Sequence, residues 1–98
     1  MATFITTMHF TEQGIKAVRD TCERAAAFKA TAKKMGVKVT GIFWTLGYFD
    51  GVIIFEAADG ETAAAAMIQL SGQGYVHTTT SRAFEAGEID KVVAKLGK

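Results

Sequence analysis

The sequence has one cysteine, no long apolar run and no excess of charge of either sign. Cys22 has no second cysteine in the chain to pair with, so an internal disulfide is excluded and a reducing compartment, by default the cytoplasm, is expected. No stretch of about 18 consecutive apolar residues occurs. Because the first residues also lack the basic start and the apolar stretch of a signal peptide, we expect neither a membrane span nor a leader.

Charge is nearly balanced, with 11 basic and 10 acidic residues spread along the chain. Nucleic-acid-binding domains gather their basic residues on one face, whereas the longest basic run here is Lys33-Lys34, so nucleic acid is not an expected partner. The 98 residues, 49% of them hydrophobic and 21% charged, suffice for one core but not for two. We expect a single domain over residues 1–98, without linker, internal repeat or low-complexity segment.

Hydrophobic periodicity predicts four strands and three helices. Strands are expected over 3–10, 37–46, 51–55 and 75–84, and helices over 11–36, 61–70 and 87–96. Thr11 and Asp59 are suited to cap the first two helices, and Asp20-Thr21 is a point where the first helix divides into two segments. The helical stripe predicts a core position for Cys22.

The order β-α-β-β-α-β plus a terminal helix predicts an α+β, ferredoxin-like fold. Right-handed crossovers place the first strand beside the third, the second outside the third and the fourth outside the first, with both helices on one face. In the second strand, Val37, Val39 and Phe43 are expected to alternate against Ile42, Trp44 and Leu46. Because strands carry apolar residues on both faces, the uncovered face is expected to pack against a second copy through residues such as Phe43 and Ile53.

Two histidines are the first candidates for chemistry. The fourth strand runs antiparallel to the first, which brings His77 close to His9 on one sheet face. Such a pair could share a metal or act in acid/base catalysis. No third ligand accompanies them in the sequence, so no metal is expected.

The turn between the second and third strands holds two more candidates, Tyr48 and Asp50. Glycine and aspartate suit a hairpin turn without any function. The alternative is that both side chains line the mouth of a cavity, where the carboxylate orients a ligand or accepts a proton. Trp44 is a candidate to point into that cavity, or else belongs to the core.

Arg82 and Thr80 lie on the last strand and are candidates for ligand binding. A guanidinium group binds a carboxylate or phosphate with two hydrogen bonds, and Thr80 could add a hydroxyl. The structural alternative for Arg82 is a salt bridge across a dimer, for example to Glu56. Threonine also favours strands for reasons unrelated to binding.

Several segments together resemble the GYD-domain family. They are Trp44-Thr45-Leu46-Gly47-Tyr48-Phe49-Asp50, Phe55-Glu56-Ala57, Ala2-Thr3-Phe4, Phe10-Thr11-Glu12-Gln13-Gly14-Ile15 and Thr80-Ser81-Arg82-Ala83-Phe84. Phe49 stands where the family commonly has tyrosine, and a tyrosine precedes it. The family is similar to dimeric α+β barrels, so the resemblance implies two ferredoxin-like sheets packed face to face. The family has no generally assigned activity.

Three functional hypotheses follow. The first is a homo-oligomeric domain, a dimer or larger, that binds a small, partly apolar ligand between sheet and helices without a cofactor. The second is a cofactor-free monooxygenase or isomerase that uses His9, His77, Asp50 and Tyr48 as acid/base groups. The third is a structural or assembly protein without a ligand. Fold analogy does not select among them.

Overall fold

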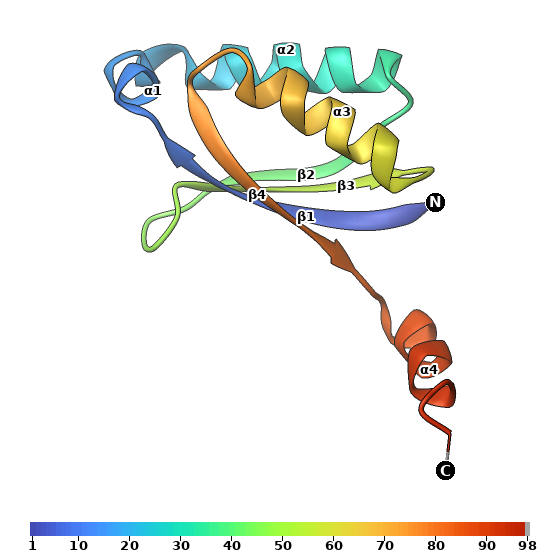
Figure 1. Ribbon diagram of the computed structural model, residues 1–98. Coiled ribbons are helices and arrows are strands. Elements are labelled where there is room, and N and C mark those ends of the chain that lie inside the picture. The colour runs from blue at the N-terminus through green and yellow to red at the C-terminus, as the bar shows by residue number, and fades with distance from the viewer. Residues whose placement is uncertain (98) are drawn as a thin grey trace.

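The computed structural model describes residues 1–97 and confirms the predicted α+β architecture. The elements are β1 (Ala2–Phe10), α1 (Glu12–Lys16), a 3₁₀ turn (Val18–Asp20), α2 (Thr21–Lys34), β2 (Lys38–Trp44), β3 (Gly51–Ala57), α3 (Gly60–Ser71), β4 (Val76–Ala83) and α4 (Ala86–Ala94). The sheet is antiparallel in the predicted order β2-β3-β1-β4. Helices α2 and α3 cover one face and leave the other, here called the open face, uncovered (Figure 1).

The helices begin where the sequence predicts caps. The Thr11 hydroxyl accepts a hydrogen bond from the Gly14 amide at 3.0 Å, and the Asp59 carboxylate accepts one from the Thr62 amide at 2.8 Å. The first helical region divides before Thr21, as expected, because the 3₁₀ turn interrupts it. After α2 the chain reverses at Gly36, whose φ of 83° is a conformation that glycine adopts without a side-chain clash.

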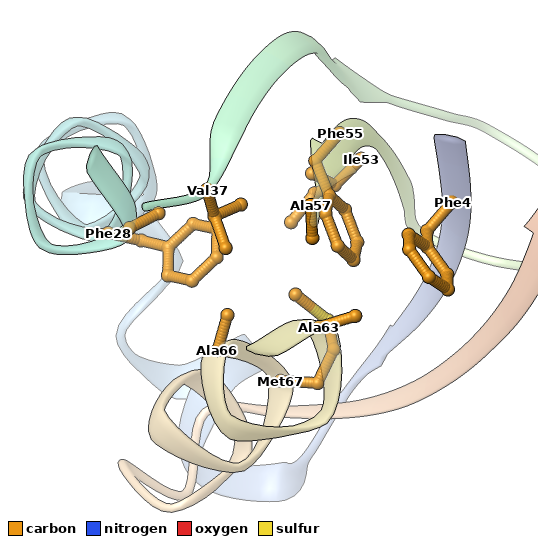
Figure 2. Packing of buried hydrophobic residues seen from close by; sticks show 10 residues of the cluster. Phe4, Phe28, Val37, Ile53, Phe55, Ala57, Ala63, Ala66 and Met67 are labelled. Atoms are coloured by element: carbon orange, nitrogen blue, oxygen red, sulfur yellow. The ribbon is translucent and has the colours of Figure 1, made fainter. Parts of the chain in front are cut away.

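The core lies between the covered face of the sheet and the two long helices. Figure 2 shows Phe28 of α2 and Met67 of α3 pointing toward Phe4 and Phe55 of the sheet. The Phe4 and Phe55 rings stack with their centroids 5.3 Å apart. Other buried members are Ala32, Val37, Ile53, Ala57, Ala63 and Ala66. Small alanines on the helices let them approach the sheet closely, so a chain of this size closes a dense core.

The expected alternation along β2 is wrong beyond Val39. The pairing of β2 with β3 shifts between Val39 and Gly41, so one extra residue is accommodated there. A bulge of this kind reverses which face the following side chains take. Phe43, opposite Val52, is therefore on the open face, whereas Ile42, opposite Ile53, joins Val39 on the covered face.

Ile53 was expected on the open face and is instead 2% exposed in the core. Side chains alternate along a strand, so Ile53 and Phe55 face the helices, whereas Val52 and Ile54 face the open side. Of the two residues expected at the interface with a second copy, only Phe43 lies on the open face.

The core position predicted for Cys22 is also wrong, because this thiol is exposed. The buried residue of α2 nearest to it in sequence is Phe28. Helical residues advance about 100° each, so two successive three-residue steps leave Cys22 about 120° away from Phe28 around the axis. The apolar stripe predicted from the sequence therefore does not coincide with the side of α2 that packs on the sheet.

Helix α4 stands away from the sheet and from the other helices (Figure 1). The molecule measures 54 × 31 × 18 Å, and its radius of gyration is 14.9 Å. A compact chain of this length has a radius of gyration of about 12.6 Å. The excess reflects the projection of α4. Within residues 1–97, no helix combines the length and the apolar character needed to cross a membrane.

Candidate functional site

A cavity lies between the sheet and the first turns of α2. It holds about 570 Å³ of empty space when its open mouth is included, but only about 50 Å³ admits the centre of a water-sized sphere. The lining residues are mainly apolar: Met8, Phe10, Thr21, Arg24, Ala25, Phe28, Ile42, Trp44, Asp50, Gly51, Ile53, Leu70, Gln73 and Val76. This is the arrangement typical of a small-molecule site, in which a mostly apolar wall carries a few polar groups.

Trp44 forms part of the wall contributed by β2. Its indole Nε1 donates to Thr21 Oγ1 at 3.0 Å, which ties the end of β2 to the start of α2. Trp44 as a whole is still 46% exposed. Because it is the only tryptophan of the chain, its fluorescence reports directly on this cavity.

Arg24 is a lining residue that the sequence interpretation missed. Its Nη1 donates to the Ala17 carbonyl oxygen at 2.7 Å, and its guanidinium carbon lies 4.2 Å from the centre of the Tyr75 ring. The sequence does contain an indication of this position: Arg24 comes four residues before Phe28, and this spacing places both side chains on one face of α2.

Asp50 lines the same cavity. Its Oδ2 accepts from the Phe10 amide at 2.8 Å, and its own amide donates to the Met8 carbonyl oxygen at 2.7 Å. These two bonds attach the hairpin turn to the end of β1. Asp50 thus has a structural role in addition to its place in the cavity wall.

His9 and His77 are directly paired across β1 and β4 and lie on the open face. The His9 Nε2 is 2.8 Å from the Tyr48 carbonyl oxygen, and the His9 and Tyr48 rings meet edge to face at 5.7 Å. The structure therefore brings His9, His77 and Tyr48 together. Met8 and Phe10 line the cavity, so alternation along β1 points His9 to the opposite face of the sheet.

The histidines and Asp50 are consequently on different sides of the sheet, which separates the four acid/base candidates into two groups. Within the part of the chain that the structure describes, no cluster of three or more histidine, cysteine, aspartate or glutamate side chains is arranged to hold a metal ion. An acid/base reaction inside the cavity would have to proceed without His9 and His77.

Thr80 and Arg82 lie on the covered side of β4, opposite Thr6 and Phe4. The Thr80 hydroxyl is 2.8 Å from the buried Thr6 hydroxyl, so it satisfies a polar group beside the core. Neither Thr80 nor Arg82 is part of the cavity wall described above.

Arg82 connects the sheet to α4. Its Nη2 lies 3.0 Å from Glu88 Oε2, and its guanidinium group stacks over the Phe84 ring at 4.4 Å. Its ion-pair partner within the chain is thus Glu88, and a salt bridge to Glu56 across a dimer stays a prediction. Hydrogen bonds from the Arg82 side chain and, to a smaller extent, from the Glu85 amide lower the pKa of Glu88.

Two exposed apolar surfaces lie outside the cavity. The open face presents Ile5, Phe43, Val52 and Ile54, of which Phe43 is 56% exposed. Helix α4 presents Ile89, Val92 and Val93 and the turn after it presents Leu96, at 42, 41, 55 and 78% exposure; these four residues are here called the α4 stripe. Their spacing of i, i+3, i+4 and i+7 is that of an amphipathic helix that has a face to bury. Both surfaces are suited to contact another protein.

The fold and these surfaces define a small ferredoxin-like α+β domain with an apolar cavity. The chain belongs to the GYD-domain family, which matches residues 4–93. It is 31% identical over 90 residues to a protein of Thermus thermophilus named glutamine synthetase and cystathionine beta-lyase binding protein. The match covers 91% of this chain and 95% of that relative. Among solved structures, none matches this chain significantly.

Proposed function

We propose that this chain is a protein-binding module that docks on metabolic enzymes through α4. The observation that carries the proposal is the α4 stripe, which leaves three large apolar side chains exposed on a helix that stands clear of the domain (Figure 1) and a fourth, Leu96, in the turn that follows it. Recognition helices that bind in a groove use anchors at this spacing. The Thermus relative, which is named for binding two enzymes, supports this kind of partner.

The α4 helix is also built to keep its shape while projecting from the domain. The Glu88 carboxylate accepts a hydrogen bond from the Glu85 amide at 3.1 Å at the start of the helix, and Arg82 holds Glu88 at 3.0 Å. A helix held in shape before binding loses less conformational entropy when it docks. The exposed stripe is therefore presented in a form suited to binding.

The test uses purified glutamine synthetase and cystathionine beta-lyase from the source organism of this chain, each immobilised for biolayer interferometry. Val93→Glu introduces a charge into the stripe, whereas Ala94→Glu introduces the same side chain at the next exposed position of α4. We expect the wild type and Ala94→Glu to bind at least one enzyme. The affinity of Val93→Glu should be lower by a factor of at least about 30, as for an interface hot spot.

Absence of binding by the wild type to both enzymes, or equal binding by both variants, would contradict the proposal. The mass of each variant in solution is measured in parallel by light scattering. If Val93→Glu alone changes the subunit number, α4 docks on a second copy of the chain and the enzyme-binding role of the stripe is refuted.

We further propose that the chain works as a homodimer or larger assembly through its open face, in the cytoplasm. The open face carries the apolar residues Ile5, Phe43, Val52 and Ile54, and one of its edges pairs Lys38 with Glu56. A two-fold related copy would cover the apolar area. The exposed thiol of Cys22 suits a reducing compartment, because oxidation would cross-link chains.

A second candidate function, binding of a small, partly apolar ligand, is favoured by the cavity between sheet and helices. Its apolar wall and few polar groups are what such a ligand requires. The enzymatic alternative has less support, because the histidines face away from the cavity. Quenching or a shift of Trp44 fluorescence on adding a ligand would report occupancy directly.

A further inference from the structure

We infer that the cavity selects small monocarboxylates with an apolar body, and that Arg24 binds the carboxylate. This inference rests on the second candidate function and names its ligand class. Arg24 is the cationic member of an otherwise mainly apolar wall. A ligand with an apolar body and one negative charge matches both properties of the cavity.

The Arg24 guanidinium is held in place before any ligand arrives. Nη1 is engaged by the Ala17 carbonyl oxygen at 2.7 Å, and the plane rests on Tyr75 with 4.2 Å between guanidinium carbon and ring centre. A guanidinium group has five N–H donors, so the bond to Ala17 leaves others for a ligand. An arginine fixed in this way loses little side-chain entropy when it binds a carboxylate.

The charge of Arg24 is also not neutralised by the other charged group of the wall. Within residues 1–97, the ion pairs closer than 4.0 Å are Lys16–Glu12 and Arg82–Glu88. Asp50, the carboxylate in the same wall, accepts a hydrogen bond from the Phe10 amide instead. An anion from outside is the natural counter-charge for Arg24, and repulsion from Asp50 favours one negative charge over two.

The apolar part of the ligand is expected to rest on the inner wall. Phe28 and Ile53, which are 3% and 2% exposed, are buried members of this wall, and Ile42 and Trp44 belong to its β2 side. About 50 Å³ of the cavity admits the centre of a water-sized sphere, so the cavity has room for a group larger than a single water. This size suits a single ring or a short branched chain.

The experiment is a titration of the full chain with phenylacetate and with phenylacetamide, which has the same shape without the charge. Binding is followed by Trp44 fluorescence and by isothermal titration calorimetry. We expect the wild type to bind phenylacetate about tenfold or more tightly than phenylacetamide, the difference that one charge-assisted hydrogen bond of about 1.4 kcal/mol produces.

Arg24→Gln should abolish the preference for the acid, whereas Arg19→Gln, at an exposed arginine before α2, should preserve it. Arg24→Lys keeps the charge and should retain part of the preference, which guards against a merely structural effect of losing the side chain. Circular dichroism establishes that each variant is folded before it is titrated.

Equal affinity of the wild type for acid and amide would overturn the role of Arg24 while leaving ligand binding by the cavity intact. A preference that persists in Arg24→Gln would overturn it as well. If neither compound binds at millimolar concentration, both this inference and the second candidate function fail.

Discussion

The Asp50 carboxylate accepts a hydrogen bond from the Phe10 amide at 2.8 Å, and this contact joins the turn of the GYD signature to the end of β1. The two residues are 40 positions apart in sequence. The aspartate therefore continues the attachment of β3 to β1 beyond the last ladder pair, Met8 with Gly51. A structural reason for the signature aspartate exists without any reaction.

Asp50→Ala is expected to lower the free energy of unfolding by about 1–3 kcal/mol, because the partly buried Phe10 amide loses its acceptor. Asp50→Asn should cost less, since its amide oxygen still accepts. Urea unfolding followed by circular dichroism measures both. Asp90→Ala, at an exposed position of α4, is the control. If Asp50→Ala lowers the free energy of unfolding no more than Asp90→Ala does, the structural role of Asp50 is contradicted.

Gly14→Ala is expected to destabilise the fold by about 3 kcal/mol or more, as for severe overpacking. A methyl group at Gly14 would lie 1.9 Å from the Tyr75 carbonyl oxygen, and this carbonyl is fixed by a 3.0 Å bond from the Thr11 amide. Gly60→Ala is the control, because a methyl group there meets no atom within 4 Å. Similar melting temperatures for the two variants would refute the close approach.

The pH dependence of stability should contain a contribution from Asp59, the cap of α3. The backbone hydrogen bond from Thr62 lowers the pKa of Asp59. A lowered folded pKa stabilises the protein above the unfolded carboxyl pKa of about 3.9, and this stabilisation is lost as the pH falls through the folded value.

Asp59→Asn keeps a capping side chain but does not titrate, so its unfolding midpoint should decline less on acidification than that of the wild type. Asp59→Ala should be less stable than the wild type near neutral pH, and this difference in stability should disappear in acid. Urea midpoints measured from neutral to acidic pH test this. Parallel curves for the wild type and Asp59→Asn would show that the cap makes no contribution to pH dependence.

Phe43→Arg and Ile53→Arg should have opposite consequences although both residues lie on neighbouring strands. Phe43 is 56% exposed on the open face, so its variant is expected to fold and to lose self-association. Ile53 is 2% exposed in the core, and an unpaired buried charge costs several kcal/mol, so its variant should be unfolded or nearly so. Light scattering and circular dichroism separate the two effects. A stable dimer of Phe43→Arg would exclude the open face as the interface.

The sequence determined the order of elements, the caps at Thr11 and Asp59 and the sheet order, and even the pairing of His9 with His77. These follow from local periodicity, side-chain capping and the handedness of crossovers, all of which are encoded within a few residues of chain or by general rules. The resemblance to the GYD family came from the residues of the turn and the strands, and the family match confirms it.

Only the tertiary structure decided which face each side chain takes. The bulge after Val39 reverses β2 and is not visible in an alternation pattern read with an ideal period. The exposure of Cys22 follows from the ideal helical period only once the structure shows that Phe28 marks the buried side of α2. The cavity that joins Arg24, Trp44 and Asp50 requires a helix, a strand and a turn to meet, and the projection of α4 depends on where β4 ends. Such features arise from packing between segments that are distant in sequence, because side chains in a close-packed interior must fit one another. In a strand, one extra residue moves all the following side chains to the other face of the sheet.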